Sequence, residues 1–198
     1  MNRKFIFDSN CVLKSILNKE ENIDILKDFI ETILNIKISK IHQREDLDDE
    51  YIFEKYLGIA NVTIVTDTNK ELNIGIQIVD GLYIQNKMFL HYAQLYSNII
   101  KTITINILDC EYFNTINYHK VMRVKDLAFD EEHFESKEAG ELHVLELPKF
   151  KDTQIDTKEK AWINYLKYGK LSEETNNEYE KIEKLDNSLN EYWKSEKL

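Results

Sequence analysis

The sequence is poor in the two residues that most often mark flexible joints between domains. Its 198 residues include one proline and five scattered glycines. No Gly- or Pro-rich linker can be recognised, so we expect continuous packing rather than several separate domains. A chain of this length is long enough for one domain with a proper core. We predict one domain over residues 1–170, followed by a polar helical extension over residues 171–198.

Cysteine is scarce, and several catalytic motifs are missing. Cys11 and Cys110 are the two cysteines, with no CxxC spacing and no histidine in ligand register. They indicate neither a disulfide framework nor a zinc site, and we expect two buried thiols. The five histidines show no HxH or HExxH spacing, and there is no GxSxG motif or glycine-rich phosphate loop. Nucleophilic hydrolases and nucleotide hydrolases are therefore disfavoured.

Long apolar runs and positive charge are also in deficit. Nowhere do about 18 apolar residues follow one another, and the N-terminal MNRKFIFDSN lacks the apolar stretch of a signal peptide. We therefore expect a cytoplasmic protein that does not contact membranes. Lys and Arg number 26 against 36 Asp and Glu, a formal net charge of −10. Nucleic-acid binding depends on Lys and Arg, so a surface that binds nucleic acid throughout is excluded and only a local basic groove remains.

Helical spacing of apolar residues predicts several helices. The clearest lies at residues 21–34 (ENIDILKDFIETIL), whose apolar stripe is suited to packing on a sheet. The polar segment 37–54, with its acidic run at 45–50, is predicted to be a solvated loop or helix start. Residues 172–196 carry sparse apolar residues three or four apart, typical of a packing or partner helix. The predicted helices lie at residues 10–17, 21–34, 83–101, 161–168 and 172–196.

The apolar period changes to two from residue 58. GIANVTIVTD and LNIGIQIV, separated by the turn-prone TNKE, predict a β-hairpin. In its second strand, Asn73, Gly75 and Gln77 share a polar face and the isoleucines share the other. Pro148 ends the last strand, because proline cannot continue a ladder. The predicted strands lie at residues 58–67, 72–79, 102–108, 119–125 and 141–147. Together the elements predict an α/β (α+β) fold with a mixed sheet.

Five segments, read in order, carry a family resemblance. They are NCVLKSILNKEENIDILKDFIETIL, ANVTIVTDTNKELNIGIQIV, KMFLHYAQLYSNII, TITINILDCEYF and ELHVLELPKF, which span roughly residues 8–170. They resemble the opening segment, metal-site hairpin, following helix, next strand and late Leu-Pro-Lys-Phe strand of the transposase-associated PD-(D/E)XK nucleases. The resemblance implies a restriction-endonuclease-like core, with a mixed central sheet flanked by helices, and a site for Mg²⁺ in active members.

The site positions implied by this resemblance do not carry the family's acids. The catalytic aspartate falls at Asn61, and the Glu-x-Gln pattern falls at Gly75 and Gln77, so only the glutamine is kept. The acid of the first helix falls at Asn10, and Lys14 matches the lysine that follows it. Since Mg²⁺ affinity depends on the charge and number of its ligands, we expect weak or no binding of Mg²⁺.

Two further sets of residues bear on function. In the helix after the hairpin, the basic position that could meet substrate phosphate falls at Met88, with Lys87 and His91 as neighbours that could substitute, and Arg123 is a further candidate contact to nucleic acid. Acids that could have moved to replace the missing ligands are Glu54, Asp67, Glu71 and Asp80.

Three functions fit these observations. The leading hypothesis is a catalytically inactive nuclease fold without a cofactor, acting as a binding or regulatory module. Its partners would be DNA, an active relative of the same family, or a second copy bound through the C-terminal helix. The alternative is a Mg²⁺-dependent DNA endonuclease of transposition or recombination with displaced metal ligands. A third is a nucleic-acid-binding module that uses Lys87, Lys101, Lys120, Arg123 and Lys125.

Overall fold

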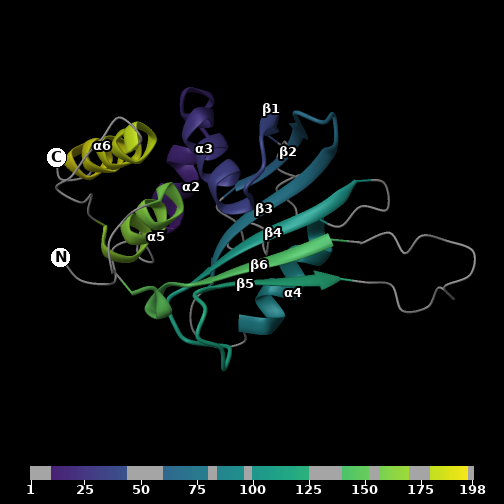
Figure 1. Cartoon of the computed structure of the whole chain (residues 1–198). Helices are drawn as coiled ribbons and strands as arrows, with labels where there is room; N and C mark the ends of the chain where they lie inside the picture. The colour runs from purple at the N-terminus through teal and green to yellow at the C-terminus, as the bar shows by residue number, and fades with distance from the viewer. Residues whose placement is uncertain are drawn as a thin grey trace, which may run out of the picture.

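A six-stranded mixed sheet forms the centre of the protein (Figure 1). The computed structural model describes residues 10–43, 60–79, 84–95, 100–124, 140–151, 157–169 and 179–195. The strand order is β1-β2-β3-β4-β6-β5. Strands β3, β4 and β6 are parallel, and the other neighbouring pairs are antiparallel. The strands are β1 (Ile38–Gln43), β2 (Ala60–Thr66), β3 (Glu71–Val79), β4 (Lys101–Leu108), β5 (His119–Val124) and β6 (Gly140–Glu146).

Helices cover both faces of this sheet. Figure 1 shows α2, α3, α5 and α6 on one face and α4 on the other. This arrangement confirms the predicted α/β fold with a mixed sheet and flanking helices. In the described ranges, no helix is long and apolar enough to cross a membrane. The helices are α2 (Asn10–Leu17), α3 (Ile23–Leu34), α4 (Ile84–Leu95), α5 (Lys158–Tyr168) and α6 (Glu180–Ser195), with 3₁₀ turns η1 (Glu20–Asn22) and η3 (Leu147–Lys149).

Strand β1 corrects the prediction of a loop or helix start over residues 37–54. Residues 38–43 pair with β2 along one edge of the sheet. The register shifts between Ile38 and Lys40, as in a β-bulge. Such a shift interrupts the alternation of apolar and polar side chains by which a strand is recognised in sequence. The acidic run at 45–50 lies outside the described residues.

The predicted hairpin of β2 and β3 is present and well defined. Asn61 lies opposite Gly75, and Thr63 lies opposite Asn73. The turn closes through a hydrogen bond from the backbone N–H of Asn69 to the carbonyl of Thr66, at 3.0 Å. Asn69 has a φ of 57°, a left-handed conformation that asparagine adopts more readily than most residues. An asparagine at this position therefore fixes the turn although the sequence lacks an Asn-Gly pair.

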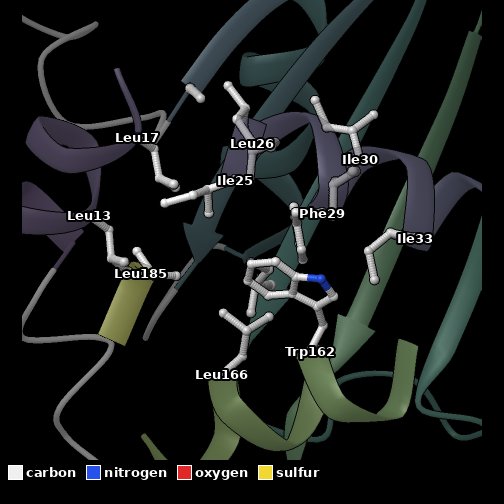
Figure 2. Packing of buried hydrophobic residues seen from close by; sticks show 14 of the residues in the cluster. Leu13, Leu17, Ile25, Leu26, Phe29, Ile30, Ile33, Trp162, Leu166 and Leu185 are labelled. Carbon is white, nitrogen blue, oxygen red and sulfur yellow. The ribbon is translucent and has the colours of Figure 1, made fainter. Parts of the chain in front are cut away.

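The larger core lies between the sheet and helices α2, α3, α5 and α6. Figure 2 shows side chains of α3 meeting Trp162 and Leu166 of α5, with Leu185 of α6 nearby. The rings of Phe29 and Trp162 pack edge to face, with centroids 5.2 Å apart. The indole N–H of Trp162 donates to Asp28 of α3 at 3.0 Å, so its polar atom is satisfied inside this packing. Each large apolar side chain buried here contributes about 1.5–3 kcal/mol to folding.

Helix α6 uses its apolar stripe within the chain. Ile182, Leu185 and Leu189 are buried, and α6 packs on α2 and α3. Lys184 adds an ion pair to Asp24 of α3, at 2.7 Å. Self-association through this stripe would therefore require α6 to leave its place. The separation of residues 171–198 from the main domain stays a prediction.

The free cysteine departs from expectation. Cys110 is half-buried rather than fully buried, and it follows β4 in the loop toward β5. Burial, with the nearby charges of Asp109 and Glu146, raises the pKa of its thiol. A raised pKa keeps the thiol protonated and poorly nucleophilic at neutral pH. The side chain of Cys11 lies outside the described residues.

Gly140, at the start of β6, leaves no room for a side chain. A Cβ atom there would lie 2.2 Å from the backbone oxygen of Thr102 and 2.7 Å from the hydroxyl of Tyr92. The backbone oxygen cannot swing aside as a side chain could. We predict that Gly140→Ala lowers the free energy of unfolding by roughly 1–3 kcal/mol, measured by urea denaturation. An unchanged midpoint would mean that β4 and β6 separate at no cost.

Candidate functional site

A row of neutral polar side chains crosses three strands on the face covered by α4. Gly75 of β3 lies between Asn61 of β2 and Thr104 of β4 in the strand register. Gln77 lies beside Asn106 of β4. All of these positions face the same side, because side chains alternate along each strand. The polar face of β3 thus continues onto β2 and β4, and we refer to these five residues as the polar floor.

The amides of the polar floor bind each other. The Gln77 side-chain N–H donates to Oδ1 of Asn106 at 2.5 Å. Asn106 in turn donates to Oγ1 of Thr104 at 3.1 Å and to the backbone carbonyl of His143 at 3.0 Å. Gln77 is 1% exposed and Asn106 is fully buried. These hydrogen bonds offset the cost of burying amides, and they leave both side chains engaged inside the protein.

Helix α4 places His91 over Asn61. Nε2 of His91 lies 3.2 Å from Oδ1 of Asn61. Since Oδ1 only accepts hydrogen bonds, the neutral imidazole donates from Nε2. Burial lowers the pKa of His91 to about 4, so the ring is neutral at neutral pH. Its Nδ1 is buried and has no hydrogen-bond partner in the described part of the chain.

This donor set does not fit Mg²⁺. The ion prefers carboxylates, with water and phosphate oxygens completing its octahedron. The polar floor offers amides, a hydroxyl and a glycine, and His91 adds an imidazole. Across the described ranges, no group of three or more His, Cys, Asp or Glu side chains converges as a metal site would need.

The acids that could have moved do not lie over the polar floor where they are described. Glu71 and Asp67 are both exposed near the hairpin turn. Glu71 pairs with Val65, four residues along β3 from Gly75 and therefore about 13 Å away. Asp80 and Glu54 lie outside the described residues.

The candidates on the first helix are not brought to the polar floor. Lys14 is half-buried in α2, which packs on α3 and α6 at the opposite face of the sheet. Asn10 begins α2, and its side chain lies outside the description.

The candidate contacts to nucleic acid are dispersed. Arg123 of β5 is 60% exposed, and its Nε lies 3.7 Å from Glu141. Lys87 of α4 is half-buried, whereas His91 is only 2% exposed. The Lys120 ammonium lies over the ring of Phe113, at 3.9 Å from the centroid. Lys101 of β4 binds the same carboxylate as Arg123, at 2.8 Å from Glu141, and Lys125 lies outside the described residues.

Comparison with known families gives this geometry its context. A sequence model of the PD-(D/E)XK nuclease family transposases matches residues 9–197. The chain belongs to this family. No curated protein and no solved structure matches it. Membership confirms the resemblance carried by the five segments, and it implies a family that typically uses a divalent metal on DNA.

Sequence reasoning missed two members of the polar floor. Thr104 and Asn106 belong to the alternating TITINIL segment, in which threonine and asparagine share one face. That alternation was a usable signal. What the sequence lacked was the order of the strands, because only the parallel pairing of β3 and β4 brings Asn106 beside Gln77.

Proposed function

We propose that this transposase-family protein has lost metal-dependent DNA cleavage and acts as a binding or regulatory module. One observation carries the proposal. Asn61 and Gly75, where the family resemblance would place the acids, lie opposite each other, and the polar floor around them is neutral and buried. Two formal negative charges are therefore missing where a cation would be held. Metal-dependent cleavage needs the ion to activate water and to stabilise the leaving oxygen.

The hydrogen bonds around the missing acids support the same proposal. A working site needs free ligand atoms directed at a solvated cavity. Here Oδ1 of Asn61, the atom that would bind a cation, already accepts a hydrogen bond from His91. A cation bound to Asn61 would have to displace that hydrogen bond. We therefore infer that the fold is kept for what it binds.

Family membership makes DNA the first partner to test, and an active relative of the same family the second. The net charge of −10 opposes binding of DNA over a broad surface. Binding would have to use a few separated basic residues, such as Lys120 and Arg123, which point to opposite faces of the edge strand β5. Titration of labelled duplex DNA distinguishes the partners, because DNA binding weakens steeply as salt is raised from about 50 to 200 mM.

The purified protein is expected neither to bind Mg²⁺ or Mn²⁺ nor to cut DNA. Calorimetric titration with each ion should give no saturable heat, and supercoiled and linear DNA should stay intact in both ions. Gln77→Ala is the matched variant, because Gln77 is the one residue of the Glu-x-Gln pattern that is kept. Metal-dependent cleavage by the natural chain, lost in Gln77→Ala, would establish displaced ligands and a working endonuclease instead.

A further inference from the structure

Four ionisable side chains form a line on the face of the sheet opposite the polar floor. Nδ1 of His119 lies 3.2 Å from Glu159 of α5, and Nε2 of His119 lies 3.0 Å from Nδ1 of His143. Nε2 of His143 lies 3.4 Å from Glu141. The strand register makes the two histidines diagonal neighbours, since His119 pairs with Leu145 and His143 pairs with Val121. The line joins β5 and β6 to helix α5.

These contacts can be tested by counting hydrogens on the rings. An ionised carboxylate only accepts hydrogen bonds, so the ring nitrogens that face Glu159 and Glu141 must each carry a hydrogen. A neutral imidazole has only one. Two neutral rings would therefore direct two lone pairs at each other across the 3.0 Å between His119 and His143. Three contacts need three ring hydrogens, and the neutral pair supplies two.

A metal ion does not resolve this arrangement. The ring centroids are 5.2 Å apart and the facing nitrogens are 3.0 Å apart, so both nitrogens lie close to the line between the centroids. Lone pairs on that line would hold a metal between them only at a nitrogen separation of about 4 Å, twice a normal metal–nitrogen distance. The observed gap is that of an N–H···N hydrogen bond.

We propose that His119 and His143 share one proton, held between Glu159 and Glu141, and that this proton fastens helix α5 to the β5–β6 edge of the sheet. The pair then carries one positive charge. The three contacts require three ring hydrogens. Gain of a second proton or loss of the first changes that number, and one of the three hydrogen bonds is then lost. The attachment of α5 thereby depends on pH, independently of the transposase-family site on the other face.

The charged groups around the pair favour a single proton. Lys101 of β4 and Arg123 of β5 both reach Glu141, at 2.8 Å and 3.7 Å. Glu159 accepts from the hydroxyl of Tyr118 at 3.3 Å. Burial lowers the pKa of His143, as do His119 and Lys101, while the bond to Glu141 opposes them. A second proton on the pair is thus disfavoured.

The sign of the pH effect follows from the two carboxylates. Both carboxylates accept from a ring N–H and carry the charge that balances the single proton of the pair. The attachment of α5 is therefore weakened when the pH rises far enough to remove that proton. Deprotonation leaves lone pairs facing each other at one contact of the line.

Nitrogen-15 NMR of the imidazole rings tests the shared proton in the intact protein. Three of the four ring nitrogens of His119 and His143 should report as protonated or proton-sharing at neutral pH, and one proton should leave as the pH rises. Glu159→Gln should lower the midpoint by about one pH unit, a tenfold loss of proton affinity, since it removes one neighbouring charge. Glu191→Gln, at an exposed position of α6, should leave the midpoint unchanged.

Two results would overturn the proposal. One is a neutral pair with two ring hydrogens at pH 6 in the natural chain, which needs no variant and so does not depend on Glu159→Gln folding. The other is stoichiometric binding of Zn²⁺ that disappears in His119→Gln, which would make the pair a metal site. In the natural chain, loss of the shared proton should lower the protection of the α5 backbone amides from hydrogen exchange. The exchange rates are corrected for the intrinsic effect of pH.

Discussion

Replacement of Lys149 by methionine is expected to destabilise the protein by about 3–5 kcal/mol. Lys149 and Glu146 form an ion pair at 2.7 Å, and their side chains are 6% and 0% exposed. Oε1 of Glu146 also accepts from the backbone N–H groups of Tyr112 and Phe113. The substitution would leave a buried carboxylate without its cation. It would also remove the bond from Lys149 to the carbonyl of Phe113.

The measurement is urea denaturation at pH 7, read as a lower midpoint with an unchanged slope. Lys19→Met is the matched control, because its ion pair with Glu21 is exposed, with side chains 58% and 73% accessible. Exposed pairs contribute about 0–1 kcal/mol. Adding Glu146→Gln to Lys149→Met should restore part of the lost stability, since no unpaired charge stays buried. A loss below about 1 kcal/mol for Lys149→Met would show that water or another group reaches Glu146.

This pair explains why the late ELPK segment matters to the fold. Glu146 ends β6, and Lys149 ends the 3₁₀ turn η3 that follows. Between them they hold the loop after β4 against the end of β6. The sequence predicted that Pro148 would end the strand, and it does. Nothing in the sequence indicated that Glu146 would be fully buried, because its partners in the loop lie more than 30 positions away.

Local periodicity predicted the helices and strands well, but it did not predict what would pack against them. The alternation in ELNIGIQIV assigned the two faces of β3 correctly, because the side chains of a strand point to opposite sides whatever packs on them. It could not indicate that the polar face would also be buried. Asn73 and Gln77 are only 3% and 1% exposed, since α4 covers that face. Burial of a polar face depends on the connection between strands, which single-strand patterns do not encode.

The line of His119, His143, Glu141 and Glu159 shows the same limit at a site. These residues lie in three separate segments, and no short motif links them. Two of them become neighbours because β5 pairs with β6 in one register. Glu159 joins them only because the fold lays α5 across that edge. By contrast, Asn61 and Gly75, which the family resemblance named as site positions, are paired by a local hairpin, so their proximity could be predicted from the sequence.

Acid is expected to weaken the protein through His91 by about 3 kcal/mol between pH 6.5 and 4. Burial lowers the pKa of His91 to about 4 in the folded protein, whereas the unfolded chain has an ordinary histidine. Between these two values the unfolded chain binds a proton that the folded protein refuses. The stabilisation is therefore complete above pH 6.5 and is lost as the pH falls to 4. Its cause is the neutral ring held between α4 and Asn61.

Carboxylates contribute to acid unfolding as well, so the informative quantity is a difference between variants. Glu141 is one such group: burial raises its pKa, but hydrogen bonds from Lys101 and His143 lower it overall. His91→Gln keeps an N–H that can reach Asn61 and removes the titration. Its free energy of unfolding, measured by urea between pH 7 and 4, should fall less steeply than that of the natural chain. His42→Gln, at an exposed position of β1, should follow the natural chain. Parallel curves for all three proteins would mean that water reaches the ring of His91 and that α4 does not seal the polar floor.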